Sequence, residues 1–434
     1  MLPPGPRVPP LVNALRYARD PLRFFPRLRE RYGDVFTVSF PDFHKVVYLA
    51  EPSLVRELFT GDPAQLHAGE ANATLLEPAV GPSSVLTLDD DEHLRQRKLL
   101  LPPFHGKAVE AYREIIHAAA RRDLATWPVG EPFGIRPHTQ SITLDVILRA
   151  VYGLDDPARF ERARHVVGAF AKRSDALMLP AFMRRGRRGP WGRFICSRQE
   201  LDALVYEEIA LRRAESNGDL RDDVLSLLMR AEHDDGSPLS DRELRDELVT
   251  VVGAGHETTA TALAWAVERL VRHPEAMERL RTDEDGTYTD AVIRETLRSR
   301  PVIVDVARRL TAPLRIAGYE LPAGKLVLAS ITGLHAREDL YPDADAFRPE
   351  RFLGEPPGTY TWIPFGGGVR RCLGAAFAQE ELRIVLREIA TRADLRPADP
   401  KPERPRMRNV TIAPEHEGRV VLERPMRATG NPQP

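Results

Sequence analysis

The sequence predicts a mainly α-helical fold with small peripheral β-sheets, an α+β architecture. Apolar residues recur at helical spacing through most of residues 92–272, with loops expected at 127–132, 184–193 and 233–237. Segments 34–40 and 44–49 are rich in Val, Phe, Thr and Tyr and flank a turn that contains proline, which predicts a hairpin. Further strands are expected at 314–316, 325–330 and 420–422.

The composition is that of an ordinary globular protein. The 434 residues are 42% hydrophobic and 29% charged, which excludes disordered, collagen-like and disulfide-stapled classes. With 62 Lys+Arg against 63 Asp+Glu, the net charge of -1 gives no general attraction to nucleic acid or to an anionic membrane, and argues against nucleic acid as a partner. The length allows two or three domains, or one large fold that can bury a cofactor.

Cysteine usage and the N-terminal segment predict a cytoplasmic protein. Only Cys196 and Cys372 are present, so at most one disulfide can form, and a chain of this size does not need one. The N-terminus is rich in proline, and arginines interrupt the apolar stretch that follows it. We therefore expect no signal peptide and no membrane span, and a loose tail from Pro425 onward.

One long helix is strongly predicted by the sequence. Ser240 and Glu243 form a capping-box pattern, apolar residues continue over 244–271, and His273-Pro274 ends the run. A helix of about 32 residues is roughly 48 Å long, so it must cross the whole fold. Its middle, 253–259, contains two glycines and a Thr pair, which are poor helix formers. Either close helix packing or a functional distortion explains that choice.

The segment 362–374 carries the clearest chemical signal. Cys372 precedes a helical run at 375–390, a position that favours a thiolate acting as a metal ligand or nucleophile. Zinc and iron-sulfur sites need more thiolates than this chain has, whereas one thiolate can hold an axial position of a haem. The glycines at 366–368 permit close backbone approach, and Arg370 and Arg371 suit paired carboxylates such as haem propionates. Cys196 has no such context and is interpreted as an inert thiol.

These residues resemble a family. Five of them match, position by position, the cysteine-ligand signature of the cytochrome P450 haem-thiolate monooxygenases: Phe365, Gly368, Arg370, Cys372 and Gly374. Three further motifs follow the family order. Segment 254–258 resembles the oxygen-binding part of the long central helix, 295–298 the glutamate/arginine motif, and 347–352 the loop whose arginine joins that pair. The resemblance covers essentially the whole chain and implies a single haem domain over 1–434.

The resemblance implies roles in binding haem b. Cys372 is expected as the axial iron ligand, with Phe365 packed under the haem and Gly374 in the same loop. His93 and Arg97, one helical turn apart, are expected to hold a propionate. Arg308 and Arg370 are the other expected propionate partners, with Arg309 as the alternative to Arg308. Gly255 is expected to leave room for O2 above the ring. The connection from His273 to Glu295 is shorter than in many members, which leaves its helix count open.

The implied activity is insertion of one oxygen atom of O2 into an apolar substrate. Thr258 is expected to hydrogen-bond the bound oxygen, and Glu257 to link it to solvent protons. A peroxide-driven enzyme, an isomerase or dehydratase, or a non-catalytic haem sensor would not need this acid/alcohol pair. Electrons are expected from a ferredoxin with its reductase, because the chain carries no flavin or iron-sulfur domain. Its docking patch is expected to include Arg371, Arg95 and Lys98.

The substrate is expected to be fatty-acid, terpenoid or steroid-like. Residues 176–183 are apolar and rich in Met, Leu and Phe, and by resemblance they form the lid of the substrate channel. The arginines at 184–193 would catch a carboxylate at its mouth. Side chains of Val251, Val252 and 302–306 are expected to face the haem.

Overall fold

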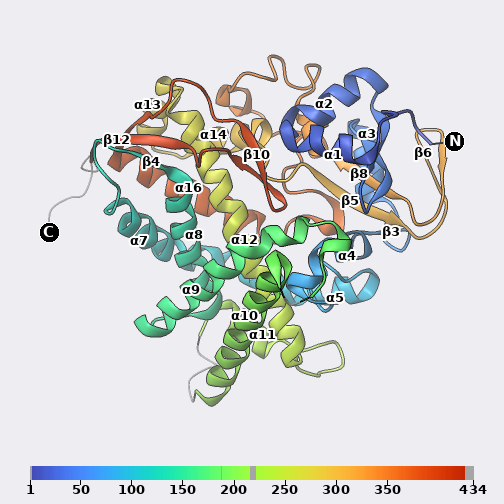
Figure 1. Cartoon of the computed structure of the whole chain (residues 1–434). Helices are drawn as coiled ribbons and strands as arrows, with labels where there is room; N and C mark the ends of the chain where they lie inside the picture. Colours follow the sequence, from blue (N-terminus) through green and yellow to red (C-terminus); the bar gives the residue numbers. More distant parts are fainter. Residues whose placement is uncertain (1, 187, 216–220, 426–434) are drawn as a thin grey trace.

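The computed structural model describes residues 2–186, 188–215 and 221–425, and Figure 1 shows a largely helical body with a sheet at one side. The α-helices are α1 Pro10–Arg19, α2 Pro21–Tyr32, α3 Pro52–Thr60, α4 Ala68–Val80, α5 Asp90–Leu100, α6 Lys107–Ala111, α7 Arg113–Leu124, α8 Ile135–Tyr152, α9 Pro157–Arg173, α10 Gly189–Ala214, α11 Val224–Arg230, α12 Asp241–Leu270, α13 Pro274–Arg281, α14 Thr287–Ser299, α15 Ile331–His335 and α16 Ala375–Arg392. Short 3-10 turns include η2 Ser174–Met178, η3 Ala181–Met183, η5 Pro349–Phe352 and η6 Gly368–Arg370.

The strands are β1 Val35–Phe40, β2 His44–Leu49, β3 Leu66–His67, β4 Pro132–Gly134, β5 Asp305–Leu310, β6 Leu314–Ile316, β7 Tyr319–Leu321, β8 Leu326–Ser330, β9 Ala393–Pro397, β10 Pro405–Arg408, β11 Thr411–Pro414 and β12 Arg419–Pro425. The expected hairpin is confirmed, with β1 antiparallel to β2 from the pair Val35↔Leu49 to the pair Phe40↔His44. It belongs to a five-stranded sheet of order β1-β2-β8-β5-β3, in which β2 and β8 are parallel. Strand β5 was not predicted, because its sequence is rich in charged residues.

The predicted central helix is confirmed as α12, which runs through the middle of the molecule in Figure 1. Ser240 and Glu243 form the expected capping box, in which the Ser240 side chain accepts the Glu243 N–H and the Glu243 side chain accepts the Ser240 N–H. From Thr259 to Leu270 every residue of α12 is buried. Trp265, fully buried, donates its Nε1–H to the Ile412 carbonyl at 2.8 Å and fixes the β10–β11 hairpin against the helix.

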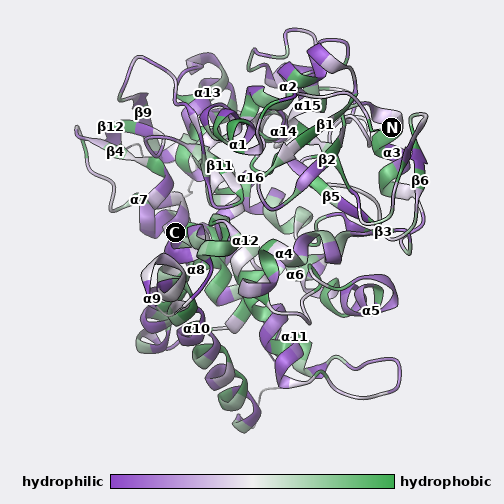
Figure 2. Cartoon of the chain, turned by 45° about the vertical axis from the view of Figure 1, so that its right-hand side comes forward, coloured by the Kyte–Doolittle hydropathy of each residue, from purple (hydrophilic) through white to green (hydrophobic). Residues whose placement is uncertain are grey.

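The short connection after α12 still holds two helices, α13 and α14, joined by a turn at 282–286. The expected turn at 233–237 is present, with the His233 N–H donated to the Ser237 carbonyl. The predicted loop at 184–193 is shorter, because α10 already starts at Gly189. Figure 2 shows hydrophilic residues along outer helices such as α5. Throughout the described ranges, no helix combines the length and apolar character that crossing a membrane requires. Tail residues 426–434 lie outside the described residues.

A buried ion pair connects α14 to the segment that carries Cys372. Glu295 and Arg298, 0% and 1% exposed at their side chains, pair at 2.7 Å, and Arg351 of η5 approaches Glu295 at 3.2 Å. Arg298 also donates to the His335 carbonyl at 2.9 Å. His335 in turn accepts the Ile363 N–H at 3.0 Å through Nε2, at the start of the cysteine segment. Residues spaced three apart in one helix therefore hold a loop about 70 residues away.

Replacing Glu295 by Gln should lower the free energy of unfolding by about 3–5 kcal/mol, because Arg298 and Arg351 would then be buried without a countercharge. Chemical denaturation followed by circular dichroism measures the change. Arg315→Gln, in an exposed pair with Glu320, is the control and should stay within about 0.5 kcal/mol of the parent. Equal losses in the two variants would contradict the structural role of the buried pair.

Candidate active site

Close packing against α3 sets the shape of the cysteine segment. A Cβ at Gly367 would lie 2.2 Å from the Phe59 ring, and one at Gly368 would lie 2.0 Å from the Phe59 carbonyl oxygen. Gly366 and Gly368 also have φ of +66° and +63°, where other residues are strained. The Cys372 N–H is donated to the Phe365 carbonyl at 2.9 Å, which closes the loop just before α16. The glycines thus allow the cysteine segment to pack closely against α3.

The Cys372 thiol faces an interior space. Its side chain is exposed, yet burial raises the pKa of the thiol, so the accessible surface opens inward. A hydrogen bond from the Gly374 backbone and the charges of Arg371 and Arg97 act against this rise. The backbone donor at the helix start lowers the pKa of the thiol in the expected direction, but desolvation has the larger effect. A bound cation at sulfur would reverse that balance. Both cysteines are free thiols.

Four basic side chains gather beside the cysteine segment: His93, Arg97, Arg308 and Arg370. His93, Arg308 and Arg370 line one pocket together with Phe59 and Asp90. Burial, followed by the charges of Arg370 and Arg97, lowers the pKa of His93 to about 3. Burial also lowers the pKa of Arg308 and of Arg370 to about 10, and each of them lies near another arginine.

Carboxylates compensate this cluster only in part. Arg370 pairs with Asp89 and donates to the Leu88 carbonyl at 2.6 Å. Neither Arg97 nor Arg308 has an ion pair with a carboxylate in the described part of the chain. Arg309 turns to the other side of β5, where it pairs with Glu70 at 3.3 Å. Of the two arginines, Arg308 lies with His93 and Arg370 in the pocket, and Arg309 does not.

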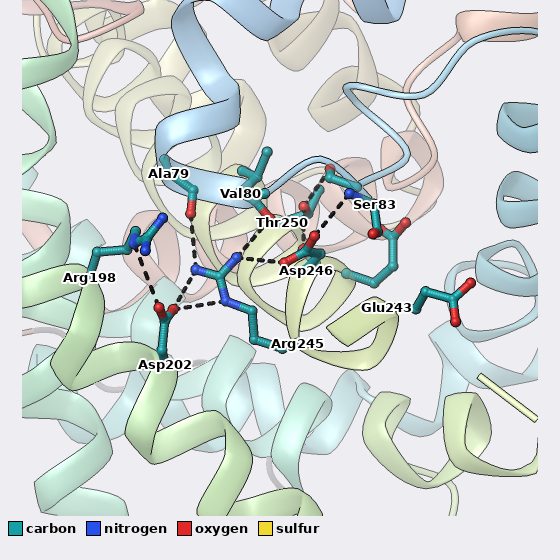
Figure 3. Close-up of polar contacts among 12 residues, drawn as sticks. Ala79, Val80, Ser83, Arg198, Asp202, Glu243, Arg245, Asp246 and Thr250 are labelled. Carbon is teal, nitrogen blue, oxygen red and sulfur yellow. Dashed lines mark hydrogen bonds and ion pairs between the residues drawn. The ribbon is translucent and has the colours of Figure 1, made fainter. Parts of the chain in front are cut away.

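Loop 81–89, which leads into α5, is held by side chains of α12 (Figure 3). Asp246 accepts the Ser83 N–H at 2.9 Å, Glu247 accepts the Val85 N–H at 2.7 Å, and the Thr250 and Ser84 hydroxyls are 2.7 Å apart. Arg245 donates to the Val80 carbonyl at 3.0 Å and pairs with Asp202 of α10, as Figure 3 shows. The loop that positions His93 is therefore fixed from one end by Arg370 and from the other by the central helix.

Residues in the middle of α12 face two different directions. Thr258 donates its hydroxyl hydrogen to the Ala254 carbonyl at 2.6 Å. A Cβ at Gly253 would meet nothing within 4 Å, and both Gly253 and Ala254 are exposed although they lie at the centre of the fold. A Cβ at Gly255 would lie 3.0 Å from Ile147 Cδ1 of α8. Gly255 therefore permits close helix packing, and the open space lies at Gly253 and Ala254.

The expected lid differs in detail from the prediction. Met178, Phe182 and Met183 are 46%, 71% and 48% exposed, so these side chains are largely solvent-accessible, whereas Ala176 and Leu177 are buried. Arg184 donates to the Thr74 carbonyl of α4 at 3.0 Å and so fastens the lid. Arg187 lies outside the described residues. Val252 is 1% exposed and packs in the core, so of the two valines only Val251 is left partly open.

Comparisons with known proteins agree with this architecture. The family model described as Cytochrome P450 matches residues 2–420. The putative cytochrome P450 135B1 of Mycobacterium tuberculosis (strain ATCC 25618 / H37Rv) is 43% identical, over 96% of this chain and 91% of that protein. The putative cytochrome P450 135A1 of the same strain is 38% identical, over 100% and 98%.

Solved structures show the same fold. The retinoic acid bound cyanobacterial CYP120A1 matches with a TM-score of 0.85 and 25% identity, over 98% of this chain and 100% of that chain. The heme domain of cytochrome P450DA matches with a TM-score of 0.85 and 22% identity, over 98% of both chains, a likeness of fold alone. The chain belongs to the cytochrome P450 family. It is a haem-dependent monooxygenase, an oxidoreductase that uses O2 and a redox partner.

The residues present fit the haem that the family implies. A single inward-facing thiol is available at Cys372, and Arg97 and Arg308 are basic groups without a carboxylate partner in the described chain. Buried positive charges that lower one another's pKa are stabilised by an anion, and two propionates supply that charge. Sequence reasoning missed Asp89, which pairs with Arg370 and accepts the N–H groups of Gly69 and Glu70. No local pattern distinguishes it from its neighbours Asp90 and Asp91.

Proposed function

We propose that this chain is a single haem b domain that hydroxylates or epoxidises an apolar small molecule with O2 and two electrons from a ferredoxin. The observation that carries the proposal is the thiol of Cys372 facing an interior space beside Arg97 and Arg308, which form no ion pair with a carboxylate among the described residues. Haem held through the thiolate supplies oxygen activation, since the thiolate pushes electron density toward the iron.

The chain's own residues take the remaining roles. Cys372 would hold the iron and Phe365 would pack beside it, while Gly374 donates its backbone N–H toward the sulfur. His93, Arg97, Arg308 and Arg370 bind the propionates. The open space at Gly253 and Ala254, in place of Gly255, would admit oxygen to the haem. Thr258, whose hydroxyl donates to the Ala254 carbonyl in this structure, would donate a hydrogen bond to oxygen at the haem, and Glu257 would link this hydroxyl to solvent protons.

Cys372→Ala should abolish the long-wavelength absorption of the ferrous carbon monoxide complex that is peculiar to thiolate haem, because no other thiol lies in the site. The spectrum of purified protein after reduction measures this. Cys196→Ala is the matched control and should keep the band at full intensity. A band that survives Cys372→Ala, or that disappears with Cys196→Ala, would show that the ligand is assigned to the wrong residue.

The proposed redox partner is a small acidic ferredoxin that docks on the face near the cysteine segment. Arg371 and Arg95 are exposed there, and the nearness of Arg371 to Arg97 places it beside α5. Lys98 adds less to the positive potential of this face, because its charge is partly neutralised by the ion pair with Asp234 at 3.1 Å. A ferredoxin reductase would complete the electron supply. We also propose a cytoplasmic location, where both cysteines stay reduced.

Reduction of the enzyme by ferredoxin should slow as salt rises, because exposed charges are screened within about 8–10 Å at 0.1–0.15 M ionic strength. Stopped-flow reduction kinetics measure the slope. Arg95→Gln should flatten it, whereas Arg315→Gln, on the β6–β7 hairpin, should leave it unchanged. Rates that do not depend on salt would rule out this docking surface.

The proposed substrate is fatty-acid, terpenoid or steroid-like. The apolar lid supports this class, and retinoic acid, which occupies the CYP120A1 structure, is an apolar molecule with a carboxylate. Arg185 and Arg188 are exposed beside the lid, whereas Arg184 is engaged with backbone carbonyls. The proposed carboxylate contact therefore falls to Arg185 and Arg188.

Replacing Arg185 and Arg188 together by Gln should weaken binding of a fatty acid about 2- to 5-fold relative to its neutral alcohol, as expected for exposed charge pairs. Titration of the substrate-induced haem spectral shift measures both affinities. Arg184→Gln should instead weaken acid and alcohol alike, because it loosens the lid from α4. Equal weakening of the two ligands by the Arg185/Arg188 variant would refute carboxylate capture.

A further inference from the structure

The Glu257 carboxylate is held on α8. Arg136 pairs with Oε1, and Gln140 donates to Oε2 at 2.7 Å. Thr261, one turn along α12, approaches Oε1 at 3.3 Å. Arg136 and Gln140 are four residues apart on one face of α8, so a single helix face supplies both strong donors. Glu257 thus points toward α8, while Thr258 next to it bonds within α12.

Arg136 connects this carboxylate to the protein surface. Its second nitrogen donates to Glu417 Oε2 at 2.9 Å, and Arg408 also reaches Glu417, at 3.2 Å. The side chains of Arg136, Glu257 and Glu417 are 11%, 19% and 30% exposed. Arg136, the least exposed of the three, therefore lies between the two carboxylates, and Glu417, the most exposed, lies in the turn before β12. The polar set extends from the centre of α12 to the surface at that turn.

A contribution to folding stability does not by itself explain why Arg136 is buried between Glu257 and Glu417. Ion pairs removed from water lose solvation, and apolar residues of similar size often stabilise a fold equally well. Arg136 cannot itself pass a proton, because a guanidinium stays protonated in proteins. What it can do is hold the Glu257 carboxylate in one orientation, next in sequence to Thr258 and linked through Arg136 to Glu417 in the turn before β12.

We propose that Arg136 is a positioning residue for proton delivery, holding the Glu257 carboxylate where it takes a proton from water near Glu417 and passes it toward Thr258. This inference rests on the proposed function, in which the acid/alcohol pair supplies protons. In each cycle Glu257 gains a proton from solvent and loses it toward Thr258, so it returns to the carboxylate, and Arg136 keeps its protons throughout.

Arg136→Gln should lower the product formed per electron pair about 3- to 10-fold, raise peroxide correspondingly and increase the solvent deuterium isotope effect on oxygen consumption. Arg136→Lys keeps the charge and should restore at least half of the coupling. Arg149→Gln removes an arginine from the same helix that stacks on Phe160 and does not touch Glu257, so it should behave as the parent. Unchanged coupling and isotope effect in Arg136→Gln would overturn the proposal.

Two further measurements separate this proposal from its basis. In the holoenzyme, unfolding of Arg136→Gln, Glu257→Gln and the double variant should be non-additive, and additive changes would overturn the pairing itself. Thr258→Ala and Glu257→Gln should each uncouple turnover. If these two leave coupling unchanged, the acid/alcohol pair is not the proton source and the proposed function fails at that point. If they uncouple while Arg136→Gln does not, only the positioning role fails.

Discussion

The structure of the interior depends on one constraint: each buried charge needs an opposite charge or a hydrogen-bond partner. The Glu295, Arg298 and Arg351 group satisfies it within the protein, since every charge meets an opposite charge or a backbone carbonyl. The group around Arg308 does not, because within the described residues Asp89 forms an ion pair with Arg370, whereas Arg97 and Arg308 have no ion pair with a carboxylate. The first group is complete as a structural frame. An anion would balance the second group, which supports the proposal that the propionates of the cofactor bind there.

The central helix couples these regions because its two halves have different tasks. Side chains of its first half hold loop 81–89 and, through it, the start of α5. Its middle faces open space on one side and α8 on the other, where Thr143 approaches the buried His256 at 2.9 Å and Gln140 holds Glu257. Its second half is buried core. The helix stays continuous through Gly253 and Gly255, and these glycines fall where its packing changes from loop support to helix contact.

Sequence patterns predicted the elements whose signals are local. The α12 capping box, the β1–β2 hairpin and the helix after Cys372 depend on neighbouring residues, and all three are confirmed. Long-range partners were not predictable. Strand β5 contains the adjacent charged residues Arg308 and Arg309, so its sequence does not alternate between apolar and polar residues. Its partners β8 and β3 are not its immediate neighbours in the sequence, so no hairpin signal predicts it.

The site shows the same division. Cys372 could be singled out from its context, and the grouping of His93, Arg308 and Arg370 followed only from resemblance until the structure placed them on one pocket. The role of Gly255 could not be read from sequence, since a glycine in a helix looks the same whether it faces a neighbour or open space. Arg136 carries no signal at all, because its partner lies 121 residues away.

The contact between Phe59 and the glycines of the cysteine segment limits how the site can vary. Because Gly367 and Gly368 lie against a ring and a backbone carbonyl, the loop has no room to retreat toward α3. The depth at which the sulfur is presented is consequently a property of the packed chain and does not depend on a bound metal to create it. Sequence changes in 176–183 and around α4 can therefore occur without moving the cysteine segment away from its packed position on α3.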